Sequence, residues 1–312
     1  MSVMGKLLVI ILLAVIKGAR SASFTVLNNC PYTVWPGFLS GAGTAPLPIT
    51  GFELPPGATQ VVVTPAQWSG RMWGRTGCTF NAQGKGNCTT GDCGGQLQCS
   101  GAGAIPPASL AEFTLDSATL DFYDVSLVDG YNLPMLVATS GGTGACIATG
   151  CITDINRSCP RELQLDDGAS TSSSNVLGCK SACEVFGSPE YCCSGAYANP
   201  NTCKPSTYSQ LFKAACPRAY SYAFDDKTST FTCKAADYAV TFCPTVAMAS
   251  EKKSNTPPVA NSPSTGSTDN ANTLYGASAS QIASTASTSD PTWTRYSLII
   301  LLLISTLADL TN

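Results

Sequence analysis

Short stretches in which apolar and polar residues alternate fill the first half of the chain, and Gly- and Pro-rich turns separate them. Alternation predicts β-strands because successive side chains on a strand point to opposite faces. The β-branched and aromatic content of these stretches supports the same interpretation. The pattern favours an antiparallel sandwich over a helical fold. The expected strands span residues 24–27, 33–35, 60–63, 111–115 and 122–128.

A different pattern occupies residues 151–203, where cysteines crowd together with little apolar periodicity. Covalent links must replace a hydrophobic core in such a segment. We therefore expect a loop-rich subdomain at about 151–215. Two short helices are predicted inside it, at 179–186 and 208–215, the second with Thr207 as its cap.

The N-terminus has the layout of a secretory signal peptide. Lys6 precedes a ten-residue apolar run at 7–16, and small residues follow up to Ser23. The run is too short to span a bilayer, which argues against a membrane anchor here. We expect residues 1–21 to be removed and the chain to be exported.

The C-terminal part changes composition after Pro244. Residues 246–296 are rich in Ser, Thr, Pro and Ala and predict a disordered linker. Small residues near 283–287, a polar spacer and an apolar tail at 297–312 are typical of a glycosylphosphatidylinositol (GPI) attachment signal. The alternative is a short transmembrane helix, but the apolar run is shorter than a helical span requires. The expected location is extracellular, on the outer leaflet of the plasma membrane.

The amino-acid composition limits which binding and catalytic chemistry the protein can perform. The chain has 312 residues, 16 cysteines and no histidine. An even cysteine count in an exported chain predicts disulfides, here eight, rather than a metal site, and no cofactor is expected. Without imidazole, the Ser/His/Asp and Cys/His arrangements are excluded, so any catalysis must use carboxylates. A formal net charge of −3 argues against nucleic acid as a partner.

One sixteen-residue motif carries a family resemblance. Residues 84–99 read GKGNCTTGDCGGQLQC, and the whole of 24–245 resembles the thaumatin-like family of pathogenesis-related plant proteins. Supporting motifs are NCPYTVW at 29–35, WGRTGC at 73–78, DFYDVSLVDGYN at 121–132, CPRAYSY at 216–222 and TFCP at 241–244. The resemblance implies a mostly β, thaumatin-like antiparallel β-sandwich over residues 22–245. It also implies a disulfide-rich loop and helix subdomain and a small β-loop subdomain at about 78–99. We expect the protein to be a monomer.

Cysteine spacing alone leaves the disulfide connectivity open. The resemblance implies one particular set of pairs. These are Cys30 with Cys243, Cys78 with Cys88, Cys93 with Cys99, Cys146 with Cys233, Cys151 with Cys216, Cys159 with Cys179, Cys183 with Cys192, and Cys193 with Cys203.

The resemblance also implies an acidic cleft. The matching positions are Arg71, Glu112, Asp124, Asp129 and Asp225. Strand alternation agrees, because Glu112 and Asp124 fall on the opposite face from their apolar neighbours. Such a cluster can accept hydrogen bonds from sugar hydroxyls, attract a cation or act on a glycosidic bond. The alternative is an ion network that only satisfies charges between subdomains.

Three functions remain open from the sequence. The first is a cell-surface defence protein that binds β-1,3-glucan or related wall carbohydrate, with antifungal action. The second is a weak endo-β-1,3-glucanase with Glu112 as the acid and Asp129 or Asp124 as the second carboxylate. The third is a wall-tethered protein-interaction module without catalysis.

Two sequons are present. Asn156 begins Asn-Arg-Ser in the loop-rich segment and is a candidate for glycosylation. Asn87 begins Asn-Cys-Thr and is the weaker candidate, because its central residue should be locked in a disulfide.

Overall fold

The computed structural model describes residues 21–117, 120–168 and 175–250. The chain divides into two compact units, 1–258 and 259–312, and every described residue belongs to the first. Nearly all of the expected signal peptide, most of the expected linker and the terminal apolar tail lie outside the described residues. Within the described part, no helix has both the length and the apolar character needed to cross a membrane.

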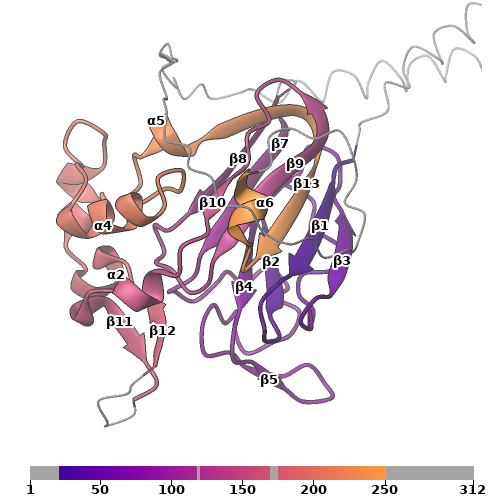
Figure 1. Cartoon of the computed structure of the whole chain (residues 1–312), viewed down its shortest axis with the longest axis horizontal. Coiled ribbons are helices and arrows are strands. Elements are labelled where there is room, and N and C mark those ends of the chain that lie inside the picture. The colour runs from indigo at the N-terminus through magenta and orange to yellow at the C-terminus, as the bar shows by residue number, and fades with distance from the viewer. Residues whose placement is uncertain (1–20, 118–119, 169–174, 251–312) are drawn as a thin grey trace, which may run out of the picture. The chain divides into compact units, whose positions relative to one another are not determined.

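β-Strands are the main regular structure of the described residues (Figure 1). The main sheet runs β10-β9-β13-β8-β7-β4-β2, and β1 and β3 branch from it through β13. Its strands are β1 (Ser23–Asn28), β2 (Trp35–Ser40), β3 (Thr59–Val63), β4 (Ser69–Arg75), β7 (Leu110–Ser117), β8 (Leu120–Ser126), β9 (Met135–Thr143), β10 (Thr149–Cys151) and β13 (Phe231–Phe242). Two small hairpins pair β5 (Thr79–Phe80) with β6 (Gly86–Asn87), and β11 (Gln164–Asp166) with β12 (Val176–Cys179).

Strand β13 joins the two halves of the sandwich. Its first three residues pair with β8, and its later residues pair with β9 on one side and β1 on the other. Ala235 lies at the change of partner, has a φ of 55° and takes no part in the ladder. A left-handed residue interrupts a strand and lets it bend. One long strand therefore contributes to both layers.

The mostly β prediction is confirmed, with one difference in strand direction. β1 pairs with β13 in parallel, with Phe24 beside Tyr238, whereas the other named pairs are antiparallel. Strands β1 and β13 lie side by side in Figure 1, in indigo and orange. Alternation within a strand carries no information about the direction of a distant partner, so the sequence could not show this.

Aromatic rings fill the space between the layers. The ring centroids of Phe24 and Phe113 are 4.6 Å apart, and those of Phe113 and Tyr238 are 5.3 Å apart. All three side chains are buried, as is Tyr123 on β8. Because alternate residues enter this core, the residues between them on β7 and β8 face outward. The core thus fixes which side chains line the outer surface of the sheet.

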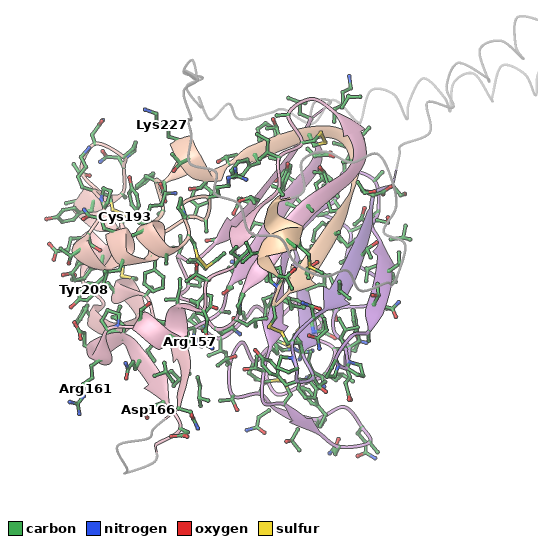
Figure 2. The ribbon with its side chains drawn as sticks, in the orientation of Figure 1. Arg157, Arg161, Asp166, Cys193, Tyr208 and Lys227 are labelled. Atoms are coloured by element: carbon green, nitrogen blue, oxygen red, sulfur yellow. A yellow bond between two sulfur atoms is a disulfide. The ribbon has the colours of Figure 1, made fainter. Side chains whose placement is uncertain are left out.

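The loop-rich subdomain lies to one side of the sheets (Figure 1). Its helices are short, and covalent bonds hold it, as Figure 2 shows around Cys193 and Tyr208. The described helices are η1 (Ile155–Ser158), η2 (Arg161–Leu163), α2 (Ala182–Phe186), α3 (Pro189–Cys192), η3 (Gly195–Tyr197), α4 (Thr207–Ala215), α5 (Asp226–Ser229) and α6 (Val246–Ser250).

Several predicted boundaries were wrong. The helix expected at 179–186 begins only at Ala182, because Cys179 completes β12. Helix α4 is capped by Ser206, whose hydroxyl accepts a hydrogen bond from the Ser209 N–H, and not by Thr207. The strand expected at 33–35 begins at Trp35, and the stretch expected as a linker opens with the short helix α6. Serine and threonine both suit an N-cap, so residue type alone could not choose between Ser206 and Thr207.

All sixteen cysteines are paired, and no free thiol remains. The eight bonds join the same partners that the family resemblance implied. They are Cys30–Cys243, Cys78–Cys88, Cys93–Cys99, Cys146–Cys233, Cys151–Cys216, Cys159–Cys179, Cys183–Cys192 and Cys193–Cys203. Such a protein folds in an oxidising compartment.

Candidate functional site: an acidic cleft across three strands

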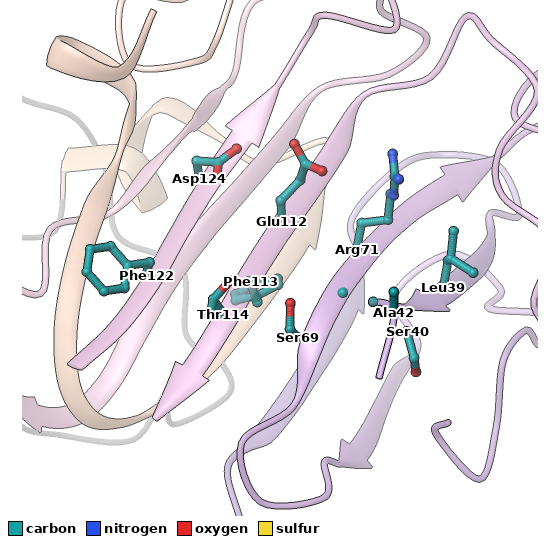
Figure 3. A pocket seen from close by; sticks show the side chains of 12 residues that line it. Leu39, Ser40, Ala42, Ser69, Arg71, Glu112, Phe113, Thr114, Phe122 and Asp124 are labelled. Atoms are coloured by element: carbon teal, nitrogen blue, oxygen red, sulfur yellow. The ribbon is translucent and has the colours of Figure 1, made fainter. Parts of the chain in front are cut away.

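Three charged residues form a row across neighbouring strands. In the strand register Arg71 on β4 lies opposite Glu112 on β7, and Glu112 lies opposite Asp124 on β8. Figure 3 shows the three side chains on the same side of the sheet. Directly opposed residues on antiparallel strands have Cβ atoms about 5 Å apart. The row therefore places one guanidinium and two carboxyl groups within reach of one ligand.

Two adjoining hollows share this row, and we call them together the acidic cleft. The first has a volume of about 320 Å³ and the second of about 330 Å³. The first is bounded chiefly by Leu39, Ser40, Ser69, Thr114 and Phe122 in addition to the row. The second adds Ser126, Asp129, Tyr220 and Asp226. One end of the cleft is therefore nearly neutral and the other acidic.

Asp129 reaches the acidic end from the turn after β8. Gly130 follows it with a φ of 82°, and its N–H donates to the Leu127 carbonyl at 3.0 Å. A Cβ atom at Gly130 would lie 2.7 Å from the carbonyl oxygen of Cys179. Only glycine fits both the backbone angle and this close approach. The Asp-Gly pair thus places Asp129 beside the row.

The neighbouring residues Asp225 and Asp226 make different contacts. The Asp225 carboxylate pairs with Lys213 Nζ at 2.8 Å and accepts hydrogen bonds from the N–H and hydroxyl of Ser221. Asp226, and not Asp225, lines the acidic hollow, where it accepts a hydrogen bond from the Tyr220 hydroxyl at 2.9 Å. The structure thus brings four of the five expected residues to the cleft and adds Asp226 and Tyr220. Adjacent aspartates in a loop give no sequence signal of which one faces a ligand.

Comparison with known proteins identifies the family of this chain. Residues 28–244 match the Thaumatin family. This chain belongs to that family. It is 59% identical over 238 residues to Thaumatin-like protein 1 of Arabidopsis thaliana, covering 73% of this chain and 88% of that protein.

Other relatives extend the comparison. The thaumatin-family chain is 55% identical over 225 residues to Pathogenesis-related protein 5 of Arabidopsis thaliana, covering 72% of this chain and 91% of that one. Among solved structures, a thaumatin-like xylanase inhibitor aligns with 25% identity and a TM-score of 0.39, over 71% of this chain and 99% of the other. A score that low carries no argument about function.

Burial sets the protonation of two carboxyl groups in this thaumatin-family cleft. Burial, reinforced by the negative charges of Glu112 and Asp226, raises the pKa of Asp124 to about 8. The pKa of Glu112 is also raised, chiefly by burial, although Arg71 opposes the shift. One oxygen of Asp124, Oδ1, is buried without a hydrogen-bond partner. Asp124 is therefore the carboxyl group that keeps its proton near neutral pH.

This arrangement offers both kinds of hydrogen-bonding group to a ligand. A protonated Asp124 and the Arg71 guanidinium can donate, whereas Asp129 and Asp226 can accept. No group of three or more His, Cys, Asp or Glu side chains within the described residues is arranged to hold a metal ion. The cleft is therefore suited to a neutral ligand with many hydroxyl groups, since each hydroxyl both donates and accepts.

Proposed function

We propose that this protein is a secreted, defence-type protein that binds β-1,3-glucan or a related wall carbohydrate through the acidic cleft. The observation that carries the proposal is the cross-strand row of Arg71, Glu112 and Asp124, which opens onto hollows on both sides. The defence role is supported by relatives whose names include pathogenesis-related proteins. Antifungal action would follow from binding at a fungal wall.

The physical case for a glycan rests on matched hydrogen bonding. Sugar hydroxyls bound to carboxylates and to a guanidinium form charge-assisted hydrogen bonds, which are shorter and stronger than neutral ones. The neutral end of the cleft adds Phe122, whose side chain is 39% exposed although it is aromatic. An exposed ring beside polar groups suits a sugar, because a pyranose has an apolar face and a polar rim.

Sedimentation with insoluble β-1,3-glucan tests the proposal. The parent protein should pellet with the glucan, and Glu112→Gln should remain in the supernatant to a much larger extent. Glu53→Gln, which removes an exposed carboxylate outside the cleft, is the matched control and should pellet like the parent. If all three proteins pellet equally, the acidic row is a structural ion network and the interaction-module alternative gains support.

A second candidate is weak endo-β-1,3-glucanase activity. It is favoured by one observation, the raised pKa of Asp124 directly opposite Glu112, since glycoside hydrolysis needs one protonated and one ionised carboxyl group. The structure points to Asp124 rather than Glu112 as the acid. An assay for reducing ends separates the two functions: a binder pellets without releasing them, whereas a hydrolase releases them and Asp124→Asn stops the release.

Export and membrane attachment are part of the same proposal. The N-terminal apolar run and small residues favour a cleaved signal peptide, and the apolar C-terminal run favours a GPI anchor on the outer leaflet. Treatment of intact cells with phosphatidylinositol-specific phospholipase C should release the protein. Retention on the membrane, while known anchored proteins are released, would contradict the anchor.

A further inference from the structure

A second cavity lies where the sandwich, the small loop subdomain and the loop-rich subdomain meet. Its volume is about 560 Å³, larger than either hollow of the acidic cleft. We call it the junction pocket. Its lining comes from the start of β2, the small loop subdomain, η1 and β12: Tyr32, Thr33, Trp35, Thr76, Gly77, Thr89, Asn132, Asn156, Val176 and Leu177. It shares no lining residue with the acidic cleft, so it is a separate place on the protein.

The chemistry of this lining differs from that of the cleft. None of the ten lining residues carries a charge. Two are aromatic, and Tyr32 is 43% exposed although its ring is large. Pockets that bind small ligands are typically apolar and aromatic, with a few placed polar groups. The ten lining residues offer an ionic ligand no charged partner, so the pocket favours a neutral one.

One polar atom of the lining lacks a partner. The Asn156 Nδ2 donates to the Asn132 carbonyl oxygen at 3.1 Å, which fixes the orientation of the side-chain amide. The Asn156 Oδ1 is buried and accepts no hydrogen bond. A buried acceptor without a donor is costly, and a bound donor would remove that cost. A purely apolar ligand would leave the acceptor unsatisfied, so the ligand must bring a hydroxyl or N–H group.

From these observations we infer that the junction pocket binds a neutral sugar ring, at a site separate from the acidic cleft. The apolar face of a pyranose packs against Tyr32 and Trp35, and one of its hydroxyl groups donates to Asn156 Oδ1. Val176 and Leu177 cover the remaining apolar surface. The inference goes beyond the proposed function, because it holds whether or not the cleft binds glucan.

Tryptophan fluorescence gives a readout that reports on this pocket. Trp35 lines the junction pocket, whereas no tryptophan lines the acidic cleft. Trp68 and Trp73 are fully buried in the core. Laminaribiose is the probe. Its titration into the purified full chain should produce a saturable change in emission.

Three variants decide between the sites. Tyr32→Ala removes an exposed ring and should weaken laminaribiose binding by at least about tenfold. Asn156→Leu removes the orphan acceptor at similar size and should also weaken binding. Glu53→Gln removes a carboxylate that lines neither site and should bind like the parent.

The inference is overturned if the parent shows no saturable change, if Tyr32→Ala binds as well as the parent, or if Glu112→Gln abolishes the signal. Unchanged melting temperatures of the variants show that they are folded. A parent that pellets with glucan but shows no fluorescence change would end this inference and leave the proposed function intact. A parent that shows the fluorescence change but does not pellet with glucan would rule out the proposed function and leave this inference intact.

Discussion

Lys213 of α4 and Asp225, the residue before α5, form an ion pair of 2.8 Å between the loop-rich subdomain and the rim of the acidic cleft. The same ammonium group donates to the Ala219 carbonyl oxygen and to the Ser229 hydroxyl. These contacts hold the loop that carries Tyr220 and Asp226 into the cleft. The loop-rich subdomain therefore shapes a site whose central residues lie on the sandwich.

Lys213→Met should loosen that loop. The pair is largely shielded from solvent, so leaving Asp225 without its partner should lower the free energy of unfolding by about 2 kcal/mol. Glucan retention should fall severalfold, because Asp226 and Tyr220 lose their fixed positions. The matched control is Lys227→Met, an exposed lysine on α5. Denaturant titration and glucan sedimentation measure both effects, and equal behaviour of the two variants would contradict the positioning role.

Asp124 should make stability depend on pH in a direction opposite to that of an ordinary surface aspartate. Its pKa is about 8 in the folded protein, against about 3.9 in an unfolded chain. At pH values between these two pKa values, Asp124 is protonated in the folded protein and ionised in the unfolded chain. The stabilisation is therefore complete below about pH 4 and is lost as the pH rises towards 8.

The variant Asp124→Asn isolates this effect. Asparagine cannot ionise, so the variant does not lose this stabilisation as the pH rises. Its free energy of unfolding, relative to that of the parent, should therefore increase between pH 4 and pH 9 by at least about 1.4 kcal/mol, the equivalent of one pKa unit. Thermal or denaturant midpoints measured across that range provide the comparison, with Glu53→Gln as the control. Parallel pH profiles for Asp124→Asn and the parent would show that Asp124 is ionised at neutral pH.

The disulfides should contribute unequally to stability. Cys30–Cys243 closes a loop with a sequence separation of 213, whereas Cys183–Cys192 closes one of only 9. On the chain-entropy model the first contributes about 5 kcal/mol and the second about 3 kcal/mol. Double Cys-to-Ala variants of each pair, unfolded in denaturant, measure the difference. A larger loss from the short loop would contradict the entropic account.

The sequence predicted the centre of the cleft better than its rim. The family resemblance implied Glu112 and Asp124, and strand alternation agreed, because each sits between residues that the core buries. The resemblance also implied Asp129, which begins an Asp-Gly turn. Asp226 could not be chosen over Asp225, because the choice depends on Lys213, which reaches Asp225 through the tertiary fold. The protonation of Asp124 was equally inaccessible, since burial and neighbouring charges act only in three dimensions.

Asn156 should carry no glycan in the folded protein, against the expectation from its sequon. Its Nδ2, the atom that a glycan would occupy, donates to the Asn132 carbonyl oxygen, and its side chain lines the junction pocket. Peptide mapping by mass spectrometry of the protein from a glycosylating host tests this. The same map reports on Asn87, which is exposed on β6. Glycan attached to Asn156 would contradict both this prediction and the junction pocket.

The central claim is that the acidic row binds a neutral glucan. The most direct test is calorimetric titration of laminarihexaose into the parent, Glu112→Gln and the control Glu53→Gln. Loss of charge-assisted hydrogen bonds predicts that Glu112→Gln binds at least about tenfold more weakly than the other two, which should bind alike. Equal affinity of Glu112→Gln and the parent, or no heat of binding from any of the three, would contradict the claim.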